Sequence, residues 1–363
     1  MTLISHSILL DKMAHYGLRG IVLDWFKNYL TNRKQFVEYN NHASATKQLS
    51  SGMPQGSILG PLGFIIYVND IPNAVPDLSL ILYADDTSAF TSHENIQTLN
   101  NTINTGLTQL NTWFNTNKLS LNHKKTNYML FGTRYKTKQC NNNFKVSLDD
   151  KEIDHVNAFK FLGVSVDQNL TWKNHIDNLV KKCSSGIGML YKVKRFLPET
   201  ALLRLYDTLV LSHINYGITA WSSANNNDRE RLHILQKRAL RAVSNSEFRS
   251  PSNPLFVKYN HLKVVDLCKY NIGTFMYKFC NDILPSTFNN MFTTNADNHN
   301  YDTRHASDFE YPNTRLEFGS KSIGYQGVKI WNNIPMHVKN SKNLNSFKHS
   351  YKEILISEYE QLN

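Results

Sequence analysis

Cysteine is scarce in this sequence, and its apolar runs are short. The 363 residues include four cysteines without paired short spacing, namely Cys140, Cys183, Cys268 and Cys280. Scattered cysteines indicate neither a zinc site nor a disulfide framework, and they fit a reducing compartment. The sequence also has no run long enough to cross a membrane and no N-terminal signal segment. These absences predict an intracellular protein, either nuclear or cytoplasmic, without a membrane partner.

Acidic residues are absent from one long interval, between Glu94 and Asp149. The whole chain carries 40 Lys and Arg against 29 Asp and Glu, a net charge of +11, which favours a polyanionic partner. The interval contains the cations Lys118, Lys124, Lys125, Arg134, Lys136, Lys138 and Lys145 and the aromatic residues Trp113, Phe114, Tyr128, Phe131 and Tyr135. Cations for phosphates and flat rings for bases are typical of channels for single-stranded nucleic acid. The alternative is a solvated helix face with aromatic residues in the core.

Two adjacent carboxylates, Asp85 and Asp86, lie between two strand-like segments. Leu80–Ala84 before them and Thr87–Phe90 after them predict a strand, a tight turn and a second strand. Adjacent carboxylates repel each other unless cations neutralise them, and hard oxygen ligands suit Mg²⁺. The alternative is an acidic surface turn. Asp149–Asp150, another such pair, is interpreted as an ordinary hairpin turn.

A loop rich in glycine and proline precedes this hairpin. Its glycines at 52, 56 and 60 and its prolines at 54 and 61 let the backbone approach a ligand closely and pre-set the turn. Gln55 adds an amide that can both donate and accept hydrogen bonds. The alternative is a plain surface loop, but its spacing from Tyr83–Asp86 favours a binding loop.

With these two motifs in this order, the chain resembles the reverse transcriptases of non-LTR retrotransposons, the LINE-like and jockey-like elements. The resemblance extends over nearly the whole chain. Its segments are Leu9–Gly17, Asn32–Gln35, Gly52–Pro61, Tyr83–Asp86, Asn117–Asn122 with Lys125, Phe161–Val164, Leu205–Tyr206, Tyr216–Gly217 with Trp221, and Gln236–Arg241. It implies an α+β fold, with part of a right-hand polymerase palm made of antiparallel sheet and helices, then a helical thumb and a mixed C-terminal region.

The function implied by this resemblance is RNA-directed DNA polymerisation, in which deoxynucleotides are added to a primer 3′ end with two Mg²⁺ ions, or with Mn²⁺ as the alternative metal. The residues so implied are the catalytic metal ligands Asp85 and Asp86, the proton donor Lys125, the template- and nucleotide-binding residues Gly52, Pro54, Gln55, Gly56 and Tyr83, and the primer-grip residues Phe161, Leu162 and Gly163. The implied partners are an RNA template, a DNA primer and deoxynucleoside triphosphates. The resemblance also allows an endonuclease domain encoded upstream.

One part of the family's pattern is missing. Catalysis in the family uses a third carboxylate, on a strand that would lie before Met1 when the chain is aligned by Ser5–Leu10. Asp11 falls at an expected helix start and Asp24 beside Trp25, so neither follows an apolar strand that could bring it to the hairpin. The resemblance therefore predicts an N-terminally truncated chain whose activity is open. The alternative function is a non-catalytic retroelement remnant that at most binds RNA or DNA.

Apolar spacing predicts the remaining elements. Helices are expected at 21–30, 96–113, 172–190, 199–212, 232–243 and 264–279, strands at 35–39, 128–131, 145–148 and 159–166, and irregular chain at 297–324. A hydrophobic content of 41% is that of a globular protein with two or three packed units. With a boundary at the polar break Asn245–Pro254, we expect partial fingers and palm at 1–170, a helical thumb-like region at 171–245 and a C-terminal region of unknown role at 246–363.

Overall fold

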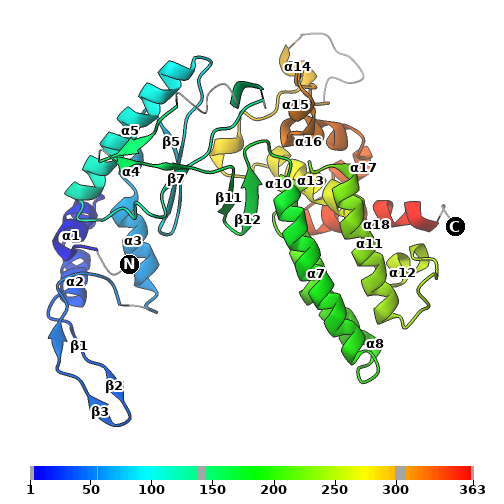
Figure 1. Ribbon diagram of the computed structural model, residues 1–363, viewed down its shortest axis with the longest axis horizontal. Coiled ribbons are helices and arrows are strands. Elements are labelled where there is room, and N and C mark those ends of the chain that lie inside the picture. Colours follow the sequence, from blue (N-terminus) through cyan, green and yellow to red (C-terminus); the bar gives the residue numbers. More distant parts are fainter. Residues whose placement is uncertain are drawn as a thin grey trace. The chain divides into compact units, whose positions relative to one another are not determined.

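The computed structural model describes residues 4–54, 56–133, 135–137, 144–149, 151–298 and 308–360. They divide into two compact units, unit 1 up to Asn157 and unit 2 from Ala158 onward (Figure 1). Both units mix helices with small sheets, in agreement with the predicted mixture of helices and strands. Within the described residues, every helix is too short or too polar to span a membrane. Six residues named above lie outside this range, namely Met1, Gln55, Arg134, Lys138, Cys140 and Asp150.

Unit 1 combines helices with strands that pair two by two. Its elements are α1 (His6–His15), α2 (Ile21–Leu30), β1 (Lys34–Gln35), β2 (Glu38–Tyr39), β3 (His42–Ala43), β4 (Lys47–Gln48), α3 (Leu59–Val68), α4 (Ile71–Ala74), β5 (Ser79–Tyr83), β6 (Asp86–Phe90), α5 (Ile96–Thr116), β7 (Asn127–Tyr128), β8 (Ser147–Leu148), β9 (Lys151–Glu152) and β10 (Asp154–His155). Antiparallel pairs join β1 to β4, β2 to β3, β5 to β6 and β8 to β9, and a parallel pair joins β7 to β10.

Helix α5 forms part of the core of unit 1. Its predicted apolar spacing is confirmed, since Leu110, Trp113 and Phe114 are buried. Asn95 caps its start, because the side-chain oxygen accepts hydrogen bonds from two backbone N–H groups of the first turn. The same core holds Leu9 of α1 and other apolar residues of the N-terminal helices. Burial of one face therefore fixes where this helix lies in unit 1.

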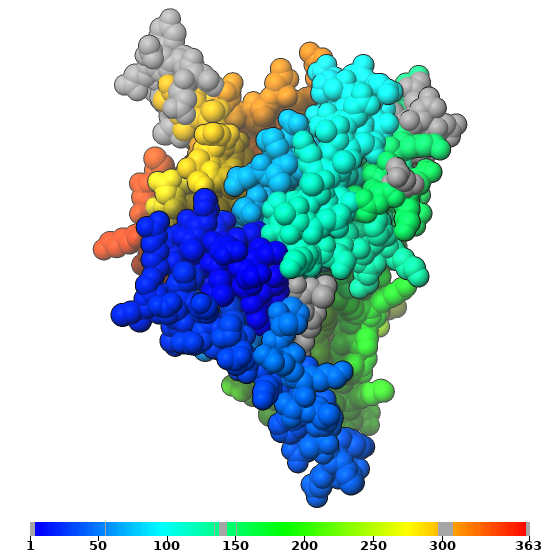
Figure 2. Space-filling view, turned by 90° about the vertical axis from the view of Figure 1, so that its left-hand side faces the viewer, coloured from blue at the N-terminus to red at the C-terminus, as the bar shows by residue number. Residues whose placement is uncertain are grey.

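A thin β-ribbon, residues 34–48, projects from the body of unit 1 (Figures 1 and 2). The prediction of one strand at 35–39 is wrong, because the chain forms two short strands, β1 and β2, with different partners. Asn40 and Asn41 both have positive φ, at 48° and 62°, as a two-residue hairpin turn requires. All four strands are exposed, so no core imposes a continuous pairing on the ribbon.

Unit 2 is mainly helical. Its elements are β11 (Ala158–Phe161), β12 (Val164–Asp167), α7 (Lys173–Val193), α8 (Glu199–Tyr206), the π-helical segment Asp207–Leu211, α9 (Ser212–Asn215), α10 (Ile218–Trp221), α11 (Asn226–Val243), α12 (Asn253–Lys258), α13 (Val264–Cys280), the 3₁₀ turn Ser286–Phe288, α14 (Asn295–Asn298), α15 (Glu317–Lys321), α16 (Ile323–Asn332), α17 (Met336–Lys339) and α18 (Leu344–Glu360). The helices predicted at 172–190, 199–212, 232–243 and 264–279 are present.

One hydrophobic core runs through unit 2. The apolar stripe predicted for α7 is buried at Ile176, Cys183 and Leu190, and α7 packs against α11. Helices on both sides of the polar break Asn245–Pro254 contribute to this core. The prediction of irregular chain at 297–324 is wrong in part, because α15 and the start of α16 fall there, and a Glu317–Lys321 ion pair of 2.9 Å spans one turn of α15.

Two glycines of α7 have opposite surroundings. A Cβ atom on Gly186 would lie 2.8 Å from the backbone oxygen of Leu209 and 3.0 Å from its Cβ, whereas a Cβ atom on Gly188 would have open space. We therefore expect Gly186→Ala to lower the free energy of unfolding by about 1–3 kcal/mol, since neighbouring backbone must move. Gly188→Ala is expected to raise it by up to about 1 kcal/mol through helix propensity. Urea unfolding measures both, and equal effects would contradict the prediction.

Acid is expected to destabilise unit 2. Burial lowers the pKa of His175, His233 and His261 from the ordinary value of 6.5. The unfolded chain therefore takes up protons as the pH falls through about 6.5, while the folded chain resists protonation, so stability present above that pH is lost below it. The thermal unfolding midpoint is expected to be lower at about pH 5.5 than at about pH 7.5. His175→Gln should weaken this dependence and the exposed His349→Gln should preserve it; a flat profile for the unaltered chain would refute the idea.

Candidate functional site

The two predicted metal ligands lie on a two-stranded hairpin. Strands β5 and β6 are antiparallel, and the last pair of their register joins Tyr83 to Asp86. Ala84 and Asp85 therefore form the turn, and Ala84 has a φ of 51°, the conformation that a tight hairpin turn demands. Leu80 and other apolar residues on one face of the hairpin pack against the core of unit 1. The core thus anchors the hairpin and leaves its turn at the surface.

The opposite face of this hairpin is open. Side chains alternate along a strand, so Asp86 shares a face with its partner Tyr83 and with Ile81 and Phe90. Ile81, Tyr83 and Phe90 are 46%, 62% and 51% exposed, which is unusual for a row of large apolar and aromatic side chains. Asp85 and Asp86 are also exposed, and neither carboxylate has a side-chain partner within the described part of the chain. Both are free to bind a cation.

The predicted binding loop is tied to the start of the chain. Gly52 and Gly56 have φ values of 85° and 80°, which only glycine adopts without strain. The N–H of Gly52 donates to the carbonyl oxygen of Ile4 (2.8 Å), and the ring Nε2 of His6 donates to the carbonyl oxygen of Gly52 (2.7 Å). Pro54 is half-buried. Hydrogen bonds therefore fix the loop at Gly52, and the loop backbone bends sharply at Gly52 and Gly56.

The side chain of Met53, in this loop, packs against Gly63 of α3. Met53 is buried in the core of unit 1, and a Cβ atom on Gly63 would lie 2.9 Å from the Met53 Cε atom. A long, flexible side chain at position 53 thus fills the space that a missing side chain at position 63 leaves. The loop and the β5–β6 hairpin are anchored on the same hydrophobic core.

In the acid-free interval between Glu94 and Asp149, some aromatic side chains are buried in the core and others are exposed. Trp113 and Phe114 are 8% and 9% exposed, so their predicted role as platforms for bases is wrong and the core alternative holds for these two. Phe131 and Tyr135 are 54% and 72% exposed. The interval also presents exposed cations at Lys118, Lys124, Lys125, Lys136 and Lys145. Exposed rings and exposed ammonium groups in the same interval keep the nucleic-acid interpretation for its surface part.

Lys125 lies in the turn that follows α5. Its N–H donates to the carbonyl oxygen of Asn122 (3.0 Å), and its own carbonyl oxygen accepts from the Asn127 side chain (3.3 Å). The side chain is exposed and has no ion-pair partner within the described ranges. The backbone of this turn is therefore fixed, while the ammonium group can move.

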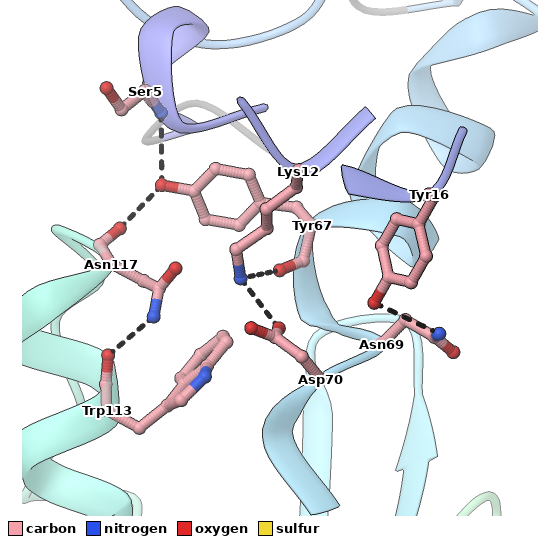
Figure 3. A network of polar contacts seen from close by, with 8 residues as sticks. All are labelled: Ser5, Lys12, Tyr16, Tyr67, Asn69, Asp70, Trp113 and Asn117. Carbon is pink, nitrogen blue, oxygen red and sulfur yellow. Dashed lines mark hydrogen bonds and ion pairs between the residues drawn. The ribbon is translucent and has the colours of Figure 1, made fainter. Parts of the chain in front are cut away.

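A half-buried lysine, Lys12, lies at the centre of a polar network in unit 1 (Figure 3). Lys12 Nζ donates to the carbonyl oxygen of Tyr67 (2.7 Å) and to Asp70 Oδ1 (2.6 Å), and it lies 4.6 Å from the ring centroid of Trp113. The Tyr67 hydroxyl donates to the carbonyl oxygen of Asn117 (2.6 Å). Burial lowers the pKa of Lys12, and Asp70 opposes that shift. This network connects α1, α3 and the end of α5.

Sequence reasoning missed this role for Lys12 and Asp70. Lys12 lies inside a segment that carries the family resemblance, but its partners Tyr67 and Asp70 are 55 and 58 positions away in the chain. A lysine beside the buried positions Leu9 and Met13 was the available signal. Asp11 lies in the middle of α1, which corrects its expected place at a helix start, and Asp24 lies in the first turn of α2. Within the described residues, no group of three or more potential metal ligands includes either acid.

The predicted primer-grip residues belong to unit 2. Strands β11 and β12 pair antiparallel, with Phe161 opposite Val164. Leu162 and Gly163 form the turn, with φ values of 43° and 84°. The strand predicted at 159–166 is thus a hairpin, and its turn coincides with the predicted grip.

Comparisons with known proteins agree with these motifs. Residues 2–166 match the family described as reverse transcriptase (RNA-dependent DNA polymerase). The chain is 26% identical over 228 residues to the RNA-directed DNA polymerase from mobile element jockey of Drosophila melanogaster, covering 60% of this chain and 24% of that protein. For the corresponding Drosophila funebris protein the identity is 25% over 228 residues, with coverage of 60% and 24%.

A relative outside Drosophila is the retrovirus-related Pol polyprotein from type-1 retrotransposable element R1 2 of Nasonia vitripennis. It is 28% identical over 180 residues, which cover 47% of this chain and 43% of that protein. The chain spans about a quarter of the length of the two jockey proteins. Residues 2–166 thus match a reverse transcriptase domain, and the chain is similar to RNA-directed DNA polymerases of mobile elements and to a retrotransposon polyprotein.

Proposed function

We propose that this chain carries out the nucleotidyl transfer of an RNA-directed DNA polymerase, adding deoxynucleotides to the 3′ end of a primer on an RNA template. The observation that carries the proposal is the β5–β6 turn. It presents Asp85 and Asp86 side by side at the surface of unit 1, without protein partners for their carboxylates in the described ranges.

The donor set of this turn fits Mg²⁺. Mg²⁺ prefers oxygen ligands and keeps several waters, so one or two carboxylates with substrate phosphates suffice to bind it. Asp85 and Asp86 supply two carboxylates with hard oxygen donors, and no lysine or arginine of the described ranges forms an ion pair with either. Mn²⁺ accepts the same ligands. When bound, such ions stabilise the charge that develops on the transferred phosphoryl group.

The other predicted residues would position the substrates. The backbone bends at Gly52 and Gly56 would let the template and the incoming nucleotide approach the loop closely. The mobile ammonium group of Lys125 would reach the leaving pyrophosphate and give it a proton. Tyr83 shares the open face of the hairpin with Asp86, where its ring would contact the nucleotide. Phe161 and Gly163 would hold the primer 3′ end.

We assign domain roles on the same basis. Residues 1–170 would form part of the fingers and palm, and residues 171–245 the thumb. Helix α7 supports the thumb role, because Lys181, Lys182 and Lys192 lie exposed on it and can neutralise the phosphates of a duplex. Residues 246–363 would form a C-terminal region, whose helices, including α13, share the hydrophobic core with α11.

Primer extension tests the proposed function directly. The purified chain is incubated with an RNA template, an annealed DNA primer, deoxynucleoside triphosphates and either Mg²⁺ or Mn²⁺. We expect extension that depends on the metal and on the template sequence. Failure to extend with both metals, in a preparation that binds the primer–template, would overturn the polymerase proposal and leave nucleic-acid binding alone.

A further inference from the structure

The turn of the β11–β12 hairpin has a strained backbone. Leu162 and Gly163 both have positive φ, at 43° and 84°. This conformation suits glycine, but it costs a residue with a Cβ atom roughly 1–2 kcal/mol. Leu162 carries that cost, so contacts from elsewhere in unit 2 must help to hold the turn.

Tyr216 provides such a contact. Its hydroxyl donates a hydrogen bond of 2.6 Å to the carbonyl oxygen of Leu162, the strained residue. Its ring also covers Gly163, since a Cβ atom there would lie 3.1 Å from the Tyr216 Cε1 atom. Tyr216 is 57% exposed, so burial of its own ring does not explain why it lies against the turn.

The backbone of Tyr216 is fixed in turn by the core of unit 2. The indole Nε1 of Trp221 donates to the carbonyl oxygen of Tyr216 (3.0 Å), and Trp221 is fully buried. Gly217 follows with a φ of 61°, and a Cβ atom there would lie 2.8 Å from the Cγ2 atom of Val164. Because Gly217 has no side chain, the segment 216–217 packs closely against the β11–β12 hairpin. The same segment connects the turn of the hairpin to the buried Trp221.

We propose that Tyr216 is a positioning residue for the primer 3′ end, acting by holding the Leu162–Gly163 turn in one conformation. The proposal rests on the proposed function, because it takes from it that this turn contacts the primer. In this proposal Tyr216 acts through the turn and not on a reacting group. It transmits the rigidity of the Trp221 core to the turn, so the turn does not relax into an unstrained conformation.

The test compares two substitutions that each remove one tyrosine hydroxyl from unit 2. Tyr216→Phe keeps the ring over Gly163 and removes the bond to Leu162. The matched control is Tyr277→Phe, which removes an equivalent 2.7 Å bond to the carbonyl oxygen of Ser341. A primer with 4-thiothymidine at its 3′ end is bound with its RNA template and irradiated. Cross-link yield to the peptide 158–167 and primer–template affinity are then measured.

We expect the wild-type chain to cross-link within 158–167. Tyr216→Phe should lower that yield about threefold to tenfold at unchanged primer–template affinity, and Tyr216→Ala should lower it further because the ring is lost as well. Tyr277→Phe should match the wild type. Equal yields from Tyr216→Phe and Tyr277→Phe would overturn the positioning role, as would a wild-type cross-link that falls entirely outside 158–167.

Hydrogen exchange separates this inference from the proposed function. Amide exchange in 158–167 needs no catalysis, and Tyr216→Phe should accelerate it about threefold to tenfold while Tyr277→Phe leaves it unchanged. A chain that fails to extend primers but shows both the cross-link and the exchange difference would count against polymerisation only. Unchanged exchange in 158–167 for Tyr216→Phe, in a chain that extends primers, would count against the positioning role only.

Discussion

Replacing Asp85 with asparagine is expected to reduce primer extension by on the order of 10³-fold or more, the scale on which loss of an essential catalytic group lowers turnover. Asparagine keeps the size of the side chain and tolerates the turn between β5 and β6, but it removes the negative charge that would bind the proposed metal. Asp86→Asn is expected to have a similar effect. Single-turnover extension of a labelled primer measures both rates, and binding of the primer–template should be unchanged.

The second acidic hairpin offers a matched control. Asp149 follows β8, which pairs antiparallel with β9, and has a positive φ of 50°. Its carboxylate is already engaged, by the side chain of Asn111 and by His123 at 3.7 Å. Asp149→Asn should therefore leave extension within about twofold of the wild type. Similar losses for Asp85→Asn and Asp149→Asn would show that the β5–β6 turn has no special role.

Metal binding can be read without catalysis. Fe²⁺ substituted for Mg²⁺ in the presence of ascorbate cleaves a protein backbone next to the metal. We expect cuts close to Tyr83–Asp86 in the wild-type chain and their loss in Asp85→Asn. Cuts confined to other segments would place the metal elsewhere and remove the basis of the polymerase proposal.

Replacing Lys12 with methionine is expected to lower the free energy of unfolding of unit 1 by about 2–3 kcal/mol. The Lys12 side chain is 14% exposed and that of Asp70 is 35% exposed. The substitution leaves the Asp70 carboxylate and the Tyr67 carbonyl oxygen without their shared donor. Partial exposure of Asp70 lets water compensate in part, so the loss stays below that of a fully buried pair. Urea unfolding, followed by hydrogen exchange in α1 and α3, measures the effect.

A double-mutant cycle isolates the ion pair from the packing of the lysine stem. If the pair matters, Lys12→Met with Asp70→Asn should cost less than the sum of the two single changes, because no unpaired charge is left. The control is Lys124→Met, an exposed lysine, which should change stability by less than about 0.5 kcal/mol. Additive losses in the cycle would assign the effect to packing.

The spacing of apolar residues was sufficient to predict those helices and strands that depend on residues close together in the sequence. The helix predicted at 21–30 is α2, and the apolar stripe beginning at Trp172 became α7, in which Ile176, Cys183 and Leu190 are buried. The β5–β6 hairpin was also predictable, because an apolar run, a pair of acids and a second run specify both strands and the turn. Helical and strand periods depend on neighbours in sequence, so the sequence contains them.

Longer-range packing decided the cases in which prediction failed. The sequence positions of Trp113 and Phe114 were compatible either with stacking on nucleic-acid bases or with burial in the core. Packing of other helices of unit 1 against α5 decided that both side chains are buried. The exposed ribbon at 34–48 lacks a core to align its strands, so one expected strand became two. Tyr216 appeared only as part of a motif, and its bond to Leu162, 54 positions away, could not be read from either segment.

The sequence by itself determined the resemblance of the chain to reverse transcriptases, the order of its motifs and the hairpin that carries Asp85 and Asp86, because each depends on residue type and short spacing. The tertiary structure alone decided which side chains are buried, that Lys12 joins Tyr67 and Asp70, and that Tyr216 supports the turn at Leu162. Those outcomes are contacts between segments about 50 or more positions apart. Their energy depends on burial and on the geometry of the donor and acceptor, and neither exists until the chain has folded.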